Sequence, residues 1–233
     1  MFKKVALITL FISLPCLSFG MDVPRNLELI DAASHGDVER VQRLIEEGAN
    51  VKSRDRHGLT PLHWAVLNWA AGMPAQGRGL EVAALLLQRD AHVNAQDNCD
   101  ETPLHMAESV AIAELLVQHG ARVGAQRKDG VTPLHLAVER QHSGIAALLL
   151  HYGAPVDAQN NYYETPLHMA ASDRDFDMVE LLLQHGAQLY AQEKHGRISL
   201  HLAALNLMGR NWENADDMVD MLLEEVQEGA KLK

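Results

Sequence analysis

Residues 130–154 read GVTPLHLAVERQHSGIAALLLHYGA, and this stretch carries the signals of a helix, a turn and a second helix. Thr132 is a good N-cap, and Pro133 is favoured at the first helical position because its missing N–H has no partner there. The run of leucine and alanine that follows ends at Gly153, which takes a left-handed closing conformation without steric cost. The stretch therefore predicts two short helices joined by a turn.

The tetrapeptide Thr-Pro-Leu-His recurs along the chain in a regular phase. It begins at residues 60, 102, 132 and 165, and a worn copy, Ile-Ser-Leu-His, begins at residue 198. Successive copies lie 42, 30, 33 and 33 residues apart, and an Ala stands two positions after each His. Leucine-rich runs that end in Gly-Ala follow in the same phase. Such a period predicts a stack of units, because one helix pair cannot bury its apolar face alone.

With these motifs, the chain resembles the ankyrin repeat family, whose signature includes Thr-Pro-Leu-His-x-Ala at a period of 33. The resemblance covers residues 25–233, nearly all of the chain. It implies an all-α repeat solenoid of helix-turn-helix units with β-turn fingers. We expect about six repeats, at 25–57, 58–99, 100–129, 130–162, 163–195 and 196–233.

Three of the expected units depart from the pattern. The first lacks the tetrapeptide and has the polar outer face of a capping repeat, and the last has lost both the Thr cap and the Pro, so residues 196–233 are expected to fray first. Insertions at Asn68–Gly79 and Asn206–Asn214 separate the two helices of their units, and they carry Trp69 and Trp212. Each insertion either forms a second contact surface, since Trp is enriched at binding hot spots, or packs over its own helices. The third unit is three residues short, so its helices should join abruptly after Ser109.

The first twenty residues have the layout of a secretory signal peptide. Lys3 and Lys4 precede the uncharged run Val5–Leu14, and Ser18-Phe19-Gly20 offers small residues before a cut at Met21. An uncleaved anchor remains an alternative, whereas Cys16 lacks the small preceding residue of a lipidation site. The prediction is a signal peptide at 1–20 and an exported protein, periplasmic or secreted, in the style of a bacterial protein.

The composition of the chain limits the class of molecule that it can bind. The chain has 233 residues, 47% of them hydrophobic, and a net charge of −11, which argues against nucleic acid because phosphate binding needs clustered Lys and Arg. Without residues 1–20, 31 acidic and 18 basic residues remain. Cys99 is then the one cysteine left, so no disulfide forms within the chain, although the thiol could pair between chains.

The sequence contains none of the common catalytic or metal-binding motifs. The chain has 13 His, but the five repeat histidines fall in different layers and cannot meet on one ion. The acidic run from Asp173 to Asp177 starts like a calcium loop and then has Met178 where the loop needs Gly. In the repeat phase this run is a turn, with Asp175 placed to cap the outer helix. We expect no cofactor, no metal, no small-molecule substrate and no enzymatic activity.

The resemblance implies a binding site on the finger tips and the exposed face of the inner helices. The principal predicted contact residues are Arg56, His57, Asn98, Lys128, Asp129, Arg140, Asn161, Tyr162, Lys194 and His195. The same strip includes Leu59, Cys99, Glu101, Val131, Glu164 and Arg197 at the fingers and Glu139, Ser172 and Asp173 on the inner helices. Tyr162 is the aromatic anchor, joined by Tyr163 and Tyr190. Each of these residues could instead be a solvated turn residue.

The resulting function hypothesis is a non-catalytic, exported, monomeric scaffold that binds a protein partner through this strip. An alternative is a secreted effector or toxin acting on a host protein. A remote alternative, from another class, is a metal-dependent enzyme that uses the His-rich surface. Membrane attachment is expected only if the signal segment stays uncleaved.

Overall fold

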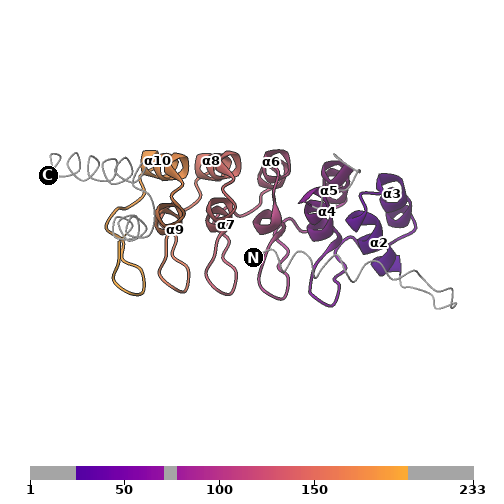
Figure 1. Ribbon diagram of the computed structural model, residues 1–233. Coiled ribbons are helices and arrows are strands. Elements are labelled where there is room, and N and C mark those ends of the chain that lie inside the picture. The colour runs from indigo at the N-terminus through magenta and orange to yellow at the C-terminus, as the bar shows by residue number, and fades with distance from the viewer. Residues whose placement is uncertain (1–24, 71–77, 199–233) are drawn as a thin grey trace.

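The computed structural model describes residues 25–70 and 78–198, and these form two layers of short helices. The inner layer contains α2 (Arg25–Ser34), α4 (Pro61–Ala70), the 3₁₀ helix η1 (Pro103–Met106), α7 (Pro133–Glu139) and α9 (Pro166–Asp173). The outer layer contains α3 (Val38–Glu46), α5 (Arg78–Gln88), α6 (Val110–Gln118), α8 (Ser143–His151) and α10 (Phe176–Gln184). Figure 1 shows the two layers as parallel rows along one axis, so the described units stand in single file.

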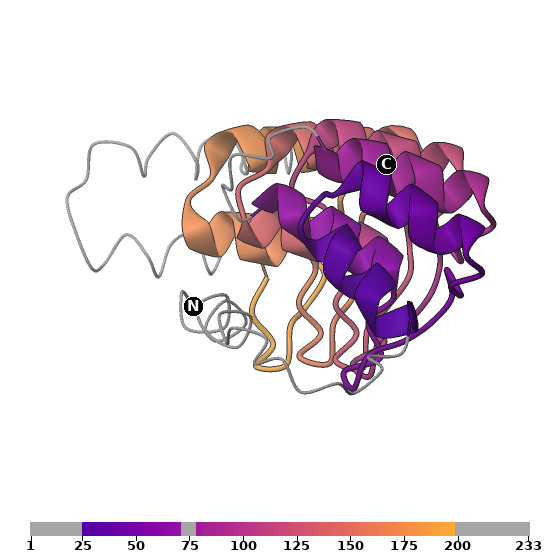
Figure 2. The same ribbon diagram turned by 90° about the vertical axis from the view of Figure 1, so that its right-hand side faces the viewer.

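Each outer helix leads into a finger-shaped loop, and the loops after α3, α5, α6 and α8 lead to the next inner helix. The fingers extend below the inner row in Figure 1, and in Figure 2 they lie on one side of the helical layers. Their tips lie at residues 55–59, 97–101, 127–131, 160–164 and 193–197. The predicted order of finger, inner helix, turn and outer helix is confirmed for this part of the chain.

The tetrapeptide begins the inner helices as expected. Thr132 and Thr165 are N-caps whose hydroxyl oxygens accept the backbone N–H of His135 and His168, and Pro follows each Thr at the first helical position. Asp175 caps α10 by accepting the N–H of Met178, so the acidic run is a turn. These bonds supply partners for amides that a helix start otherwise leaves unpaired.

Glycine closes the outer helices. Gly48, Gly120, Gly153 and Gly186 have φ between 78° and 92°, the left-handed conformation predicted for them. Asp90, which replaces this glycine in the second unit, takes φ 62°. A left-handed turn is therefore kept even where the sequence does not supply Gly.

The core runs continuously between the two layers. The middle leucine of each leucine-rich run, such as Leu86, Leu149 and Leu182, is fully buried, and each contributes about 1.5–3 kcal/mol. Ala65 and Ala170 of the inner helices are also fully buried, because small side chains let neighbouring helices approach. Each unit thus covers the apolar face of the next.

The third unit is shortened in its inner helix. Its inner segment is one 3₁₀ turn that ends at Met106, Ala107 is extended, and α6 begins after its N-cap, Ser109. The join is abrupt as predicted, but the inner helix stops three residues before Ser109, because the deletion removes its last turn. The guanidinium of Arg140, at the end of α7, donates to the backbone oxygen of His105 at 3.2 Å beside this gap.

Several predictions fall on residues outside the described ranges. They are the signal peptide at 1–20, Trp212 with its insertion, and the fraying of the last unit, of which only 196–198 are described. The bounds predicted for the first insertion are wrong, because α4 continues through Asn68 and Trp69 to Ala70 and α5 begins at Arg78; residues 71–77 between the two helices are not described. Among the described helices, none is long and apolar enough to cross a membrane.

Candidate functional site

The histidine of each tetrapeptide ties its own unit to the next finger. In the fourth unit, Nδ1 of His135 accepts the N–H of Thr132 at 3.2 Å and contacts its hydroxyl at 2.8 Å. Nε2 lies 3.1 Å from the backbone oxygen of Glu164 in the following finger. A carbonyl oxygen only accepts, so Nε2 carries the proton and Nδ1 stays free to accept. The other units repeat the bond from His63 to Glu101, from His105 to Val131 and from His168 to Arg197.

The rings of His63, His105 and His135 are held in the neutral state. Burial lowers the pKa of His63 and His135, and it lowers the pKa of His105 to about 4, against a smaller opposing effect of the backbone bond. A second proton on Nδ1 would also face the N–H of the capping Thr. The repeat histidines therefore have a structural role. No group of three or more His, Cys, Asp or Glu in residues 25–70 and 78–198 is placed to hold a metal ion.

Each finger is a tight turn fixed by hydrogen bonds from its own backbone. In the fourth finger, the N–H of Asn160 donates to the oxygen of Glu164 at 3.0 Å. The side-chain oxygen of Asn160 accepts the N–H of Tyr162 and of Glu164. Asp55 and Asp97 play the same part in the first two fingers. The side chain at the base of the turn thus holds the tip in place.

The tips are linked to one another by backbone hydrogen bonds, which form a ladder across five fingers. The bonds run from the N–H of Asn98 to His57 O at 2.9 Å, Lys128 to Cys99 O at 3.1 Å, Asn161 to Asp129 O at 2.8 Å and Lys194 to Tyr162 O at 2.9 Å. The side-chain amides of Asn98 and Asn161 add bonds to the oxygens of Arg56 and Lys128. We call this connected row the fingertip ladder. It is preorganised, which lowers the ordering cost of binding.

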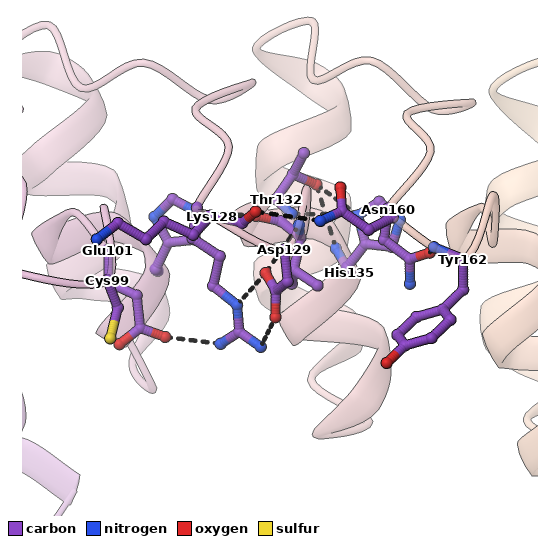
Figure 3. A network of polar contacts seen from close by, with 12 residues as sticks. Cys99, Glu101, Lys128, Asp129, Thr132, His135, Asn160 and Tyr162 are labelled. Carbon is purple, nitrogen blue, oxygen red and sulfur yellow. Dashed lines mark hydrogen bonds and ion pairs between the residues drawn. The ribbon is translucent and has the colours of Figure 1, made fainter.

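The third finger uses an ion-pair network that the sequence analysis missed. Arg127 stands where the other fingers have Asp55, Asp97 or Asn160, and its guanidinium binds both oxygens of Asp129 at 2.6 and 2.7 Å. It also reaches Glu101 of the preceding finger at 2.6 Å, so two labelled carboxylates converge on one cation (Figure 3). The hydrogen bond from Arg127 lowers the pKa of Asp129. The sequence signal for this network was the Arg at position 127, because the first, second and fourth fingers have Asp or Asn at the same place.

Most of the predicted contact residues lie on the exposed tips of the ladder. The exposed ones are Arg56, His57, Asn98, Lys128, Asn161, Tyr162, Lys194 and His195. Asp129 is half-buried, with its carboxylate held by Arg127. Arg140 is half-buried and bonded to His105 O. The structure therefore brings eight of the ten to an exposed surface and ties the remaining two to the fold.

The prediction for Leu59 is wrong. Leu59 is 7% exposed and belongs to the hydrophobic core. The equivalent positions Glu101, Val131, Glu164 and Arg197 are half-buried, and their backbone oxygens accept the histidine bonds described above. The last residue of each of these four fingers therefore links two units, because its backbone oxygen faces the histidine of the neighbouring unit.

The inner helices add polar side chains to the same strip. Ser172 and Asp173 are exposed at the end of α9, and Glu139 is half-buried at the end of α7. Partial desolvation of the carboxyl group, although its side chain is largely exposed, and the nearby charge of Asp175 raise the pKa of Asp173. The Nε1–H of Trp64, which the sequence analysis did not single out, donates to Asp55 at 3.1 Å and so braces the first finger.

Three of the exposed tyrosines lie at the fourth and fifth fingers, and a fourth, Tyr152, lies at the end of α8. Tyr162 is 59% exposed, Tyr163 is 57% exposed and Tyr190 is 63% exposed. The ammonium of Lys194 lies 5.7 Å from the ring centroid of Tyr162, a cation–π distance.

A shallow apolar groove lies on the outer layer, away from the fingers. It runs between α5 and α6 and is lined by Leu80, Ala84 and Leu115.

Comparison with known proteins agrees with this geometry. A family profile described as ankyrin repeats (3 copies) matches residues 22–97 and 67–160, and one described as ankyrin repeats (many copies) matches 149–203. A putative ankyrin repeat protein of fowlpox virus, FPV233, is 37% identical over 78 residues, which are 33% of this chain and 14% of that protein. Human Rabankyrin-5 is 37% identical over 76 residues, 33% of this chain and 6% of its own length. Zebrafish (Danio rerio) inversin is 34% identical over 89 residues, 38% of this chain and 8% of its own.

These relatives are far longer than the segments they share with this chain, which spans between 6% and 14% of their lengths. The similarity therefore concerns the repeats and not whole proteins. The family profiles, the tetrapeptide phase and the linked fingers all describe the same unit. The chain belongs to the ankyrin repeat family.

Proposed function

We propose that this protein is an exported, non-catalytic scaffold that binds a protein partner along the fingertip ladder and the adjoining inner helices. Ankyrin repeats are in general protein–protein interaction modules. The observation that carries the proposal for this chain is the ladder itself. Four backbone bonds connect five tips, and eight exposed side chains of mixed chemistry project from that row. A long, rigid surface of this kind suits a protein partner better than a small molecule.

Export is supported by the sequence of the first twenty residues. Two lysines, an uncharged apolar run and a small-residue cleavage site are the parts of a secretory signal. The destination then decides the class of partner. A periplasmic protein would bind a partner from the same cell, and a secreted effector would bind a host protein.

Site-specific photo-cross-linking tests the proposal. The full chain carries a benzophenone amino acid at His195, an exposed tip of the fifth finger, or at Gln88, an exposed position at the end of α5. Each form is irradiated with periplasmic fractions, culture supernatants and host-cell lysates. We expect a protein adduct from the His195 form that an excess of unlabelled chain removes, and no such adduct from the Gln88 form.

The outcomes separate the alternatives. An adduct in the periplasmic fraction supports a partner in the exporting cell, and an adduct in the host lysate supports the effector alternative. Equal adducts from both positions, or none in any fraction, would contradict binding through the fingers.

A further inference from the structure

One part of the fingertip ladder combines exposed rings, strain and unpaired positive charge. It consists of Lys128, Asn161, Tyr162, Tyr163 and Lys194, and we call it the fourth-finger patch. From this patch we infer the class of partner segment, an inference that rests on the proposed function.

Tyr163 holds a backbone conformation that tyrosine disfavours. Its φ is 61°, at the position where three other fingers have Gly58, Gly130 and Gly196 with φ between 75° and 81°. An L-residue with a bulky side chain is strained there, whereas glycine is not. Strain of this kind is concentrated at functional sites, although Asp90 and Asp100, with short polar side chains that tolerate it, take the same conformation. The fold needs no tyrosine at this point, since its ring is 57% exposed.

Tyr162 is held in place beside this strained residue. Its N–H donates to the side chain of Asn160 at 2.8 Å, and its backbone oxygen accepts the N–H of Lys194 at 2.9 Å. The ammonium of Lys194 lies over its ring. Figure 3 shows the labelled ring of Tyr162 projecting from the finger beside the network around Asp129. Two exposed rings on a fixed turn form an anchor with little conformational entropy to lose.

The two lysines of the patch lack acidic partners within the described residues. The ammonium of Lys128 donates to the backbone oxygen of Asn98 at 2.6 Å, and that of Lys194 faces the tyrosine ring. The nearby carboxylates have other partners, because Asp129 is bound by Arg127, Glu164 by the amide of Asn160 and Glu193 by Arg197. Positive charge thus remains available beside apolar rings, on a chain whose net charge is −11.

The chemistry that complements this patch is an extended acidic segment of a protein. Its carboxylates would pair with Lys128 and Lys194, and an apolar side chain between them would pack on Tyr162 and Tyr163. Asp173 is exposed at the far end of α9, the inner helix that follows the fourth finger, and its charge disfavours an acidic segment that crosses onto that helix. The segment therefore lies along the tips and does not cross onto the inner helices.

Selection from a library of short random peptides displayed on phage tests the inference with the full chain as target. Enriched peptides should combine Asp or Glu with an apolar residue, and their affinity should fall as salt rises. Lys128→Glu/Lys194→Glu should weaken them about tenfold or more. Arg89→Glu/Arg122→Glu makes the same change in net charge at exposed positions away from the fingers and should leave affinity within about twofold.

The tyrosines have a matched test of their own. Tyr162→Ala should weaken the selected peptides about tenfold or more, whereas Tyr152→Ala, at an exposed ring that ends α8, should not. Tyr163→Gly should raise thermal stability and still weaken binding, a combination that loss of folding cannot produce.

The remaining outcomes overturn the inference in distinguishable ways. Peptides that bind but ignore all the patch variants, or that are basic, overturn the fourth-finger patch while binding of a protein partner elsewhere on the ladder stands. A selection that enriches no peptide while the His195 cross-link also fails counts against the patch and the proposed function together.

Discussion

At the scale of single residues, the threonine and histidine of each tetrapeptide, three residues apart, make the contacts that define the repeat unit. Thr132 caps its helix, and His135 accepts from that Thr while it donates to the finger of the next unit. A local cap and a bond between units therefore depend on the same two side chains. This explains why a short motif is sufficient to identify the fold.

Loss of the cap should be measurable. Thr132→Val keeps the shape of the side chain but removes the hydroxyl that accepts the N–H of His135, so the free energy of unfolding should fall by about 1 kcal/mol. Urea unfolding followed by circular dichroism measures it. Ser143→Ala, at an exposed position at the start of α8, is the control and should change stability by less than about 0.5 kcal/mol. Equal losses of unfolding free energy in Thr132→Val and Ser143→Ala would contradict the capping role of Thr132.

The neutral histidines make stability depend on pH. The unfolded chain has histidines with a pKa near 6.5, whereas the folded pKa of His63, His105 and His135 is lower. Below about pH 6.5 the unfolded chain binds protons that the folded chain excludes, so stability is full above that pH and declines as the pH falls toward 4. Between the unfolded and folded pKa values, His105 contributes a slope of up to about 1.4 kcal/mol per pH unit, and His63 and His135 add to it in the same direction.

Urea unfolding at about pH 7.5 and about pH 5.5 measures this slope. His135→Gln removes one titrating group, and Gln at this position still completes the capping box, so the slope should decrease. An unchanged slope in His135→Gln would contradict this account, because it would mean that His135 binds protons equally in the folded and unfolded chains.

The finger is the element whose details depend on its neighbours. Gly130 and Gly153 have nearly the same backbone, with φ 79° and 78°. A Cβ at Gly130 would lie 3.0 Å from the Cα of Asn160 in the next finger, whereas one at Gly153 would meet nothing within 4 Å. Alanine substitutions at these two glycines therefore separate the effect of close finger packing from the effect of left-handed backbone strain.

This pair gives a direct test of finger packing. Both Gly130→Ala and Gly153→Ala should lose about 1 kcal/mol to left-handed strain, and Gly130→Ala should lose more because its methyl group pushes against the next finger. Thermal unfolding of the two variants measures the difference. If Gly153→Ala is the more damaging change, the fingers do not pack as described.

The helices and fingers also show which structural features the sequence could predict and which it could not. Helix order, caps, closing glycines and the exposed tips followed from the tetrapeptide phase, because each depends on local chemistry. Leu59 was misplaced, since its burial depends on the neighbouring unit, and the ion-pair network of Arg127 was missed for the same reason. The third inner helix ended earlier than expected because the deletion shortened that helix instead of the turn. Contacts between units cannot be derived from one unit's motif.

At the scale of the whole molecule, single-file stacking determines the shape. Each described unit is covered by its neighbours alone, so the molecule lengthens with every repeat (Figure 1). A compact chain of 233 residues would have a radius of gyration of about 17 Å. Small-angle X-ray scattering of the monomer should give a clearly larger value and a pair-distance distribution with a long tail. A symmetric distribution at the compact value would contradict the stack.

Hydrogen exchange with the cross-linked partner tests the central claim, that this shape exists to present the fingertip ladder to a protein. Exchange is measured by mass spectrometry on the full chain, alone and with the purified partner. We predict slower exchange at residues 97–101, 127–131, 160–164 and 193–197 in the complex, with the outer helices α5, α6 and α8 unchanged. Protection confined to the outer helices, with the fingers exchanging as in the free protein, would contradict the account.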